Sequence, residues 1–407
     1  MVPLAPGPGH EVVSVTVSRR PRLRRIGPAL GIGLLVLAVL VSLTAAWALP
    51  VIHLGRPRGP AAVGATVLQW QHQRSASGPR TVVAQVWYPA APAQGTSTRP
   101  YLGRDAAESH TVAAGLAATY GLPAWVLAGA EHGTSTSVAD AAVATGQFPV
   151  VLFSPGLAGV RTQNSAWAED LASRGHVVVA LDHPGDSAVM VLNDGTAVTS
   201  TVRSTGDDAK DEANTDRWTN LRVDDLRAAI DELPAANRAH RLLQGHLDLT
   251  RVVAAGHSVG GAAALLTADR DRRVTAVVNL DGLPRGAAKP VVPVLTLVAG
   301  HWTGDAAGAE RYAARLDATT SASRCAFRLT VPGVAHLGLT DAALFLPPLP
   351  SLVGPRLSWL ADRRAGISAS STATQVFLDH VLRGVGSSEQ VNGELAQLGP
   401  VSETCPR

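Results

Sequence analysis

The amino-acid sequence predicts an α/β fold with a doubly wound, mostly parallel sheet and helices on both of its faces. Strand-like and helix-like segments alternate along most of the chain, which is the pattern of such folds. The strand candidates are nearly continuous apolar runs, as expected for parallel strands that helices cover on both sides. With 407 residues, 46% of them hydrophobic and 16% charged, the chain can also form a large buried core.

Each expected strand is a short run rich in valine and other apolar residues, and most of the runs end at Gly, Asp or Ser. We expect strands over residues 80–88, 148–154, 176–183, 250–258, 274–282, 292–300 and 326–333. The first run precedes the regular alternation. We therefore expect an antiparallel start to an otherwise parallel sheet.

Five helix candidates lie between or after these strands. They cover residues 165–175, 220–233, 259–270, 305–317 and 372–384. In the second candidate, apolar side chains recur at steps of three and four residues, which places them on one helix face. The members of this face are Val223, Leu226, Ile230 and Leu233.

The first fifty residues predict a membrane-targeting segment. Residues 1–27 form a basic tail with five arginines and one acidic residue, whereas residues 28–50 contain no charged side chain. An apolar run of this length crosses about 30 Å of hydrocarbon, so we expect a transmembrane signal anchor with the basic tail in the cytoplasm. The alternative is a cleaved signal peptide, because Ala46–Ala48 resembles a cleavage site. In both cases the rest of the chain is exported.

The exported part is expected to have three sections. Residues 51–68 resemble a linker, because prolines are interspersed among glycine and alanine. Residues 69–390 contain the strand and helix candidates and form the folded domain, and residues 391–407 form a C-terminal tail. Cys325 and Cys405 are the only cysteines, and in an exported chain we expect them to form a disulfide rather than remain as two thiols.

The charge distribution excludes one class of partner. The formal net charge is +3, but residues 1–27 contribute +4, so the rest of the chain is close to neutral. A near-neutral domain lacks the basic surface that binding of nucleic acid requires. We therefore expect no nucleic-acid partner.

A serine between two glycines is the strongest chemical signal in the sequence. Ser258 stands in the pattern Gly256-His257-Ser258-Val259-Gly260, directly after an expected strand and before an expected helix. This context is typical of a nucleophile elbow, a strained turn that exposes the serine hydroxyl at a helix N-terminus. We expect Ser258 to be a nucleophile, with the Val259 N–H as one donor to the oxyanion.

A serine nucleophile needs a histidine that takes its proton and an acid that orients the histidine. In this fold the order along the chain is serine, acid, histidine. His336 is the best base, because it follows the last clear strand, whereas His301 leaves little room for an acid before it and His380 lies within a helix. On the residues alone the acid is either Asp281 or Asp305, since each follows a strand after the serine.

A second oxyanion donor is expected in the loop after an earlier strand. Residues 150–159 fit this expectation, because Gly156 allows the turn and the Leu157 N–H can point toward the serine. No cluster of metal ligands and no dinucleotide motif is evident in the sequence. We therefore expect no cofactor and no metal.

Four motifs in this order resemble the platelet-activating factor acetylhydrolase family of the α/β-hydrolase superfamily. They are residues 148–188, "GHSVGG" at 256–261, "NLDG" at 279–282 and "PGVAH" at 332–336. The resemblance implies an α/β-hydrolase fold, Asp281 as the acid, and Leu157 and Val259 as the oxyanion donors. The sequence departs from the family pattern at Pro155, because in the family a histidine usually precedes the glycine that corresponds to Gly156.

These observations predict a membrane-anchored or secreted serine esterase whose catalytic domain spans residues 69–390. The resemblance implies hydrolysis of short or oxidised acyl esters of phospholipids. One alternative is a broad-specificity lipase or cutinase-like esterase. An alternative of another class is a catalytically inactive, membrane-tethered binding protein.

Overall fold

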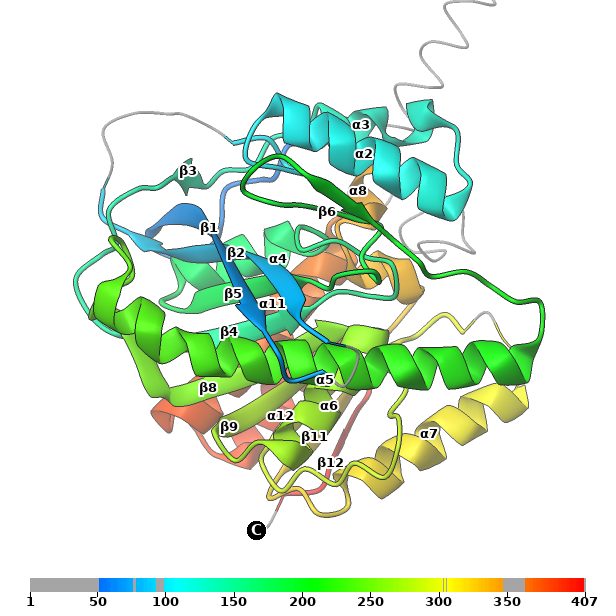
Figure 1. The fold of residues 1–407 in the computed structure, drawn as a ribbon. Helices are drawn as coiled ribbons and strands as arrows, with labels where there is room; N and C mark the ends of the chain where they lie inside the picture. Colours follow the sequence, from blue (N-terminus) through cyan, green and yellow to red (C-terminus); the bar gives the residue numbers. More distant parts are fainter. Residues whose placement is uncertain are drawn as a thin grey trace, which may run out of the picture. The chain divides into compact units, whose positions relative to one another are not determined.

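The computed structural model describes residues 51–75, 78–92, 99–302, 304, 306–346 and 363–405 (Figure 1). The chain divides into two compact units, Met1–Trp47 and Ala48–Arg407. The membrane segment expected over residues 28–50 lies outside the described residues. Within the part that is described, no helix combines the length and the apolar character needed to cross a membrane.

A ten-stranded sheet forms the centre of the larger unit. Its strand order is β12-β11-β10-β9-β8-β4-β5-β2-β1-β3. Neighbouring strands from β5 through β4, β8, β9 and β10 to β11 are parallel. These six are β4 (Phe148–Ser154), β5 (Val177–Asp182), β8 (Leu247–His257), β9 (Val274–Leu280), β10 (Val294–Ala299) and β11 (Ala326–Val331). The prediction of an α/β fold with a mostly parallel sheet is confirmed.

Antiparallel strands border the parallel region on both sides. The expected antiparallel start is present, because β2 (Arg80–Ala90) pairs antiparallel with β5 and with β1 (Ala62–His72). The short β3 (Val138–Ala139) pairs parallel with β1. At the other edge, β12 (Val401–Glu403) pairs antiparallel with β11.

Two expected boundaries are wrong. The linker expected over residues 51–68 becomes strand β1 from Ala62 onward, and Ile52 is 1% exposed in an apolar cluster. The tail expected over residues 391–407 contains most of α12 (Ser388–Ala396) and the edge strand β12. Both segments are poor in strong strand signals, and their structure depends on hydrogen bonds to β2 and β11 that local sequence does not reveal.

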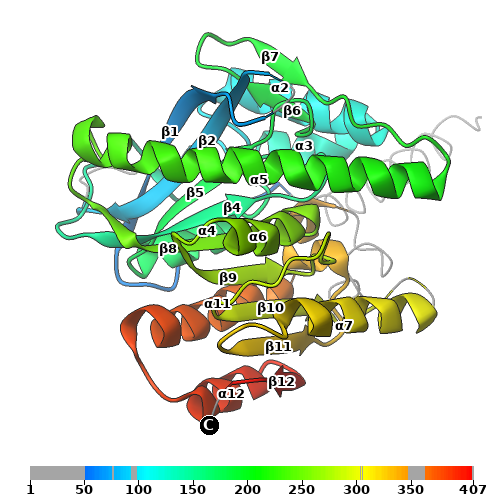
Figure 2. The ribbon, with the colours of Figure 1, turned by 60° about the horizontal axis from the view of Figure 1, so that its bottom comes forward.

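Helices cover both faces of the sheet (Figure 2). On one face, α4 (Ser165–Ser173), α11 (Ala365–Arg383) and α12 pack against the sheet, and on the other face α5 (Asp208–Ala239) and α6 (Val259–Arg270) do so. Along β4 the side chains alternate between the two cores: Val151 faces α4 and α11, whereas Leu152 faces α5 and α6. Both side chains are completely buried. The sheet is therefore covered on both sides, as the apolar runs predict.

Helix α7 (Ala306–Thr320) connects β10 to β11 and covers them on the face of α5 and α6 (Figure 2). The remaining elements are α2 (Ala106–Tyr120), η1 (Ala124–Leu127), α3 (Ala128–Glu131), β6 (Val189–Val191), β7 (Ala197–Thr199), η2 (His336–Leu339) and α8 (Ala342–Phe345). Helices α2, η1 and α8 share a third apolar cluster with β6. Much of the apolar sequence between residues 100 and 146 is therefore core of this cluster.

Helix boundaries follow the sequence most closely at α6, which spans the residues expected for it. Helix α5 is much longer than residues 220–233. It begins after Asp207, whose side chain caps Ala209 and Lys210, and it continues through Pro234. The expected apolar face of α5 is confirmed, since its four members are all at most 3% exposed.

Cys325 and Cys405 form a disulfide that fastens the end of the chain to the start of β11. The two cysteines are 80 residues apart in the sequence. In the chain-entropy description, closing a loop of this length stabilises the folded state by about 4 kcal/mol.

A first prediction concerns Gly260. A Cβ atom at this position would lie 1.9 Å from the Ser154 carbonyl oxygen, which belongs to backbone that cannot move aside easily. Gly260→Ala should therefore lower the free energy of unfolding by roughly 3 kcal/mol or more, measured by urea titration. The matched control is Gly393→Ala at an exposed position of helix α12, where nothing lies within 4 Å of the new Cβ atom. It should stabilise the protein slightly, and an equal effect of the two substitutions would contradict the close packing.

Candidate active site

Ser258 occupies a strained turn between β8 and α6. Its backbone has φ of 56° and ψ of −124°, a conformation that non-glycine residues rarely adopt. The flanking glycines leave no space for side chains, because a Cβ atom at Gly256 would lie 2.3 Å from the backbone of Gly260. The strand–turn–helix context expected from the sequence is present, and it holds the serine at the N-terminus of α6.

The start of α6 provides a free backbone donor beside the serine. The Ser258 N–H donates to the Leu280 carbonyl oxygen at 2.9 Å, which fixes the turn against β9. The Val259 N–H is the first of the helix and has no acceptor among the described residues. An N-terminal amide of this kind favours negative charge close to it.

His336 and Asp281 form a close pair near this turn. His336 Nδ1 lies 2.6 Å from Asp281 Oδ2. The other carboxylate oxygen accepts hydrogen bonds from the Ala299 N–H at 3.0 Å and from the Tyr312 hydroxyl at 3.3 Å. Burial alone would favour the neutral acid, but the hydrogen bond and charge of His336 and the Ala299 N–H outweigh it, so the pKa of Asp281 lies below its usual value.

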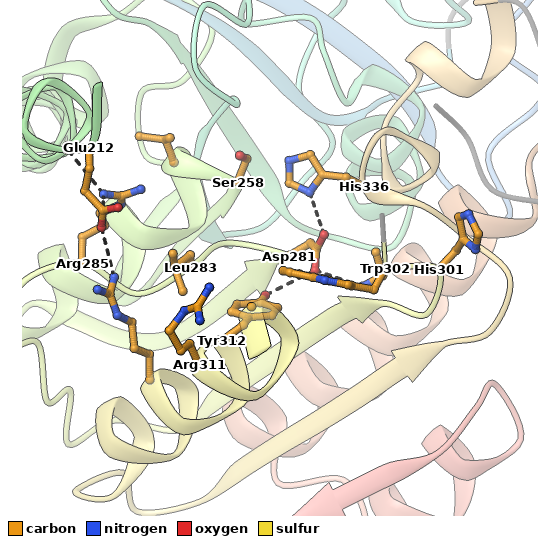
Figure 3. A pocket seen from close by; sticks show the side chains of 14 residues that line it. Glu212, Ser258, Asp281, Leu283, Arg285, His301, Trp302, Arg311, Tyr312 and His336 are labelled. Carbon is orange, nitrogen blue, oxygen red and sulfur yellow. Dashed lines mark hydrogen bonds and ion pairs between the residues drawn. The ribbon is translucent and has the colours of Figure 1, made fainter. Parts of the chain in front are cut away.

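The three side chains converge on one side of the sheet (Figure 3). In this view Ser258 lies beside the His336 ring, and the dashed line from that ring leads to Asp281. The Ser258 hydroxyl makes no hydrogen bond to any described residue, which leaves it available to a ligand. Catalytic hydrogen bonds commonly tighten only when substrate is bound.

The other histidine and acid candidates lie elsewhere. His301 lines one cavity together with Ser258 and His336, but it forms no hydrogen bond or ion pair with an acid among the described residues. His380 hydrogen-bonds to the Gly386 carbonyl oxygen at 3.0 Å, at the end of α11. Asp305 lies outside the described residues. Of the two acids that the sequence leaves open, Asp281 is therefore the one whose contact with His336 is described.

The loop after β4 packs directly on the serine turn. A Cβ atom at Gly156 would lie 3.6 Å from Ser258 Cβ and 3.1 Å from His257 Nδ1. The Leu157 N–H, which the sequence suggests as an oxyanion donor, has no acceptor among the described residues. Leu157 follows Gly156 in this loop and does not line the cavity that contains Ser258.

A cavity of about 530 Å³ opens in front of Ser258 and His336. One of its walls is aromatic, because Trp302 and Tyr312 stack with ring centroids 5.9 Å apart. The far end is charged: Arg285 lies 3.3 Å from Glu212 of α5 (Figure 3). The cavity therefore combines an apolar surface near the serine with a polar outer end, a combination that suits an amphipathic ligand.

The sequence does not indicate a role at the site for two residues, Tyr312 and His257. Tyr312 lies in an expected helix with nothing to mark it as a partner of Asp281. His257 is 1% exposed, its Nε2 lies 3.1 Å from the His336 carbonyl oxygen, and its ring lies 4.4 Å from the His336 ring. Burial, followed by the proximity of His336, lowers the pKa of His257 to about 3, so the ring is neutral near pH 7. In the sequence, only the position of His257 next to Ser258 in the serine pattern indicates that it belongs to the site.

The described residues contain no group of three or more His, Cys, Asp or Glu side chains arranged to hold a metal ion. Separately, the hydroxyl, imidazole and carboxylate of the site are the groups that nucleophilic attack assisted by proton transfer requires.

The fold places the protein in a class that includes esterases. The ferulic acid esterase from Streptomyces cinnamoneus has a similar structure, with a TM-score of 0.67 and 25% sequence identity. The similarity covers 83% of this chain and 95% of the esterase chain. The fold of this chain therefore matches nearly the whole of that esterase chain.

Within this class, the sequence is related to the platelet-activating factor acetylhydrolases. Residues 50–202 match the family model described as platelet-activating factor acetylhydrolase, isoform II. A probable 1-alkyl-2-acetylglycerophosphocholine esterase from Arthroderma benhamiae is 29% identical over 33% of this chain and 31% of its own length. A platelet-activating factor acetylhydrolase from Cavia porcellus is 29% identical over 33% of this chain and 35% of its own length. The chain thus spans about a third of the curated relatives it matches.

A second prediction concerns the pH dependence of stability at His257. A histidine with a pKa of about 3 in the folded state and 6.5 when unfolded takes up its proton mainly on unfolding between these values. Stability should therefore fall as the pH is lowered from 6.5 toward 3, by up to about 1.4 kcal/mol per pH unit for this one group. In His257→Gln the slope of unfolding free energy against pH should decrease near pH 5 by up to about 1.4 kcal/mol per pH unit, which corresponds to one proton fewer taken up on unfolding. An unchanged slope in urea titrations would show that His257 is not a buried neutral ring.

Proposed function

We propose that this protein is a serine carboxylic-ester hydrolase in which Ser258 is the nucleophile, His336 the general base and Asp281 the acid that orients it. The observation that carries this proposal is the positive-φ serine at the start of α6, next to a histidine that is hydrogen-bonded to a buried carboxylate. The relationship to esterases, reported above, supports the same reaction class.

The first step is attack on the ester carbonyl. With His336 Nδ1 engaged by Asp281, the Nε2 atom is the one that takes the Ser258 proton. The oxygen of Ser258 then bonds to the carbonyl carbon, and the carbonyl oxygen becomes an oxyanion. The Val259 and Leu157 N–H groups are the donors for this charge, since neither has an acceptor among the described residues.

The second step releases the products. The imidazolium of His336 protonates the departing alkoxide, which leaves as an alcohol and gives an acyl-serine. His336 then removes a proton from water as the water oxygen attacks the acyl carbon. The imidazolium gives this proton to the departing Ser258 oxygen, so that the carboxylic acid is released and both Ser258 and neutral His336 are regenerated. Asp281 remains ionised throughout and stabilises the imidazolium, which agrees with its lowered pKa.

For the substrate we propose short or oxidised acyl esters of phospholipids. In support, one relative named above is described as a probable 1-alkyl-2-acetylglycerophosphocholine esterase and the other as a platelet-activating factor acetylhydrolase, and residues 50–202 match the model of the acetylhydrolase family. A cavity of about 530 Å³ with a charged outer end fits a small acyl group with a polar remainder.

A second candidate is a broad-specificity esterase. The observation in its favour is that the structural similarity to a ferulic acid esterase covers 83% of this chain, against 33% for the relatives. The stacked Trp302 and Tyr312 beside the serine would suit flat acyl or alcohol groups as well as short aliphatic ones.

For the location we propose that the esterase domain lies outside the cytoplasm, anchored by residues 28–50 or secreted. The disulfide between Cys325 and Cys405 supports export, because disulfides persist in oxidising compartments.

A third prediction tests the reaction and its residues. The full-length protein should hydrolyse p-nitrophenyl acetate faster than p-nitrophenyl palmitate. Ser258→Ala should lower kcat by about 10³-fold or more, and Asp281→Asn should do so by roughly 10³-fold, because the histidine loses its orienting charge.

Asp305→Asn is the matched control for the acid and should change kcat little. If Asp305→Asn alone abolishes turnover, Asp281 is not the acid, and activity that survives Ser258→Ala removes the proposed nucleophile. Preference for the long-chain ester favours a lipase, and a wild-type protein without any activity favours the binding protein.

A further inference from the structure

We propose that the buried guanidinium of Arg222 positions the oxyanion donor of Leu157, by holding the carbonyl groups of the preceding residues on the opposite side of the loop. This inference rests on the proposed function and extends it to a residue of α5 that contacts neither Ser258 nor His336. Arg222 is a positioning residue, because it acts through the loop and not on the substrate.

The loop after β4 is almost completely hydrogen-bonded. The Gly156 N–H donates to Gln163 Oε1 at 2.7 Å, and the Ala158 N–H donates to Asp186 Oδ1 at 2.9 Å. The Leu157 carbonyl oxygen accepts from the Tyr120 hydroxyl at 2.9 Å, and the Gly156 carbonyl oxygen accepts from the Gly159 N–H.

Among the polar backbone groups of residues 155–158, the Leu157 N–H is then the exception. It has no acceptor among the described residues, although every neighbouring N–H has one. Unpaired backbone donors are rare in protected parts of proteins, and where they occur they call for an explanation. A donor kept free beside a serine nucleophile is the arrangement that an oxyanion requires.

Arg222 holds two consecutive carbonyl groups of this loop. Its Nη2 donates to the Gly156 carbonyl oxygen at 2.8 Å, and its Nη1 donates to the Pro155 carbonyl oxygen. The same Nη1 also donates to Ser154 Oγ at 3.0 Å. The side chain is completely buried, so water does not compete for these contacts.

The direction of the Leu157 N–H follows from peptide geometry. The described chain has no cis peptide bonds, and in a planar trans peptide the C=O and N–H groups point in opposite directions. The Gly156 carbonyl and the Leu157 N–H belong to the same peptide. Because Arg222 holds the carbonyl oxygen, the N–H points away from Arg222, and Gly156 of the same peptide borders Ser258.

A rigid polar network keeps Arg222 in place. Its Nε and Nη2 atoms form a two-point ion pair with Asp186, at 2.6 and 2.8 Å. Asp186 is also completely buried and holds the Ala158 N–H with one of these oxygens. Arginine and aspartate therefore hold the loop from both sides of Leu157, one through carbonyl groups and the other through an N–H.

The network continues through Ser154 and His183 to Asp225, which lies on α5 like Arg222. Ser154 Oγ accepts from Arg222, so its own proton goes to His183 Nε2 at 2.9 Å, and His183 Nδ1 donates to Asp225 at 2.8 Å. The hydrogen bonds link Ser154, His183 and Asp225 as in a catalytic triad, but all three are 0% exposed, and no substrate can reach them. They serve to fix Ser154 and hence Arg222.

The test uses the rate ratio of two esters. O-(4-nitrophenyl) thionoacetate differs from p-nitrophenyl acetate only by sulfur in place of the carbonyl oxygen, and sulfur is a weaker hydrogen-bond acceptor. An enzyme with an ordered oxyanion hole therefore prefers the oxygen ester. Arg222→Lys retains the charge but cannot reach two carbonyl groups and Asp186 at once.

In Arg222→Lys we expect kcat for the oxygen ester to fall by about 10- to 100-fold, with KM changed by less than about threefold. The rate for the thionoester should fall much less, so that the ratio of kcat/KM for the two esters decreases by about tenfold. A purely structural role would lower both rates together and leave the ratio unchanged.

Arg161→Lys is the matched control. Arg161 is another buried arginine with two carboxylate partners, Glu108 and Asp182, and its side chain holds no carbonyl of the loop. Arg161→Lys should lower the free energy of unfolding to a similar extent but keep the wild-type ratio of kcat/KM for the two esters. If Arg222→Lys does not fold, Asp186→Asn replaces it, since this change retains the arginine and loosens its position.

The outcomes separate this inference from the proposed function. A wild-type protein that hydrolyses neither ester overturns the proposed function. Wild-type hydrolysis that depends on Ser258, together with an unchanged ratio in Arg222→Lys or its replacement Asp186→Asn, overturns the positioning role alone. A lowered ratio at Arg222 with an unchanged ratio at Arg161 supports it.

Discussion

The candidate site depends on the close contact between the serine turn and the loop that follows β4. A Cβ atom at Gly260 would lie 1.9 Å from the Ser154 carbonyl oxygen, so only glycine lets these two backbones meet. Because β4 and β8 are parallel neighbours, their C-terminal ends lie at the same edge of the sheet. This contact brings Gly156 beside Ser258. It supports the proposal that the Leu157 and Val259 N–H groups serve one oxyanion site.

A second constraint on the site is electrostatic, and it acts at Asp281, the partner of His336 Nδ1. Asp281 is nearly buried, yet three hydrogen-bond donors around its carboxylate favour ionisation over the neutral acid. The neighbouring His257 shows the converse, since a buried ring with one weak partner remains neutral. The two groups lie within the same small volume and take different charge states because one has compensating partners and the other lacks them. This arrangement supports the proposal that His336, and not His257, is the general base.

The sequence alone predicts the central sheet and the candidate residues because these depend on local patterns. The apolar runs identify six parallel strands, and the serine pattern with its flanking strand and helix identifies the turn. It does not predict β1, β12 or the full length of α5, whose formation depends on strand pairing and on packing of distant segments. For the same reason Tyr312 and Arg222 could not be found: each acts through a contact with a residue more than thirty positions away, and no spacing rule connects them.

The central claim is that Ser258 is a reactive nucleophile in an esterase site. The most direct measurement is mass spectrometry of the full-length protein after reaction with a fluorophosphonate, which phosphonylates activated serines and displaces fluoride. The account predicts one adduct per chain, located on the peptide that contains Ser258, with much slower labelling when p-nitrophenyl acetate is present in excess. Labelling at another serine, or no labelling of folded protein, would contradict the account.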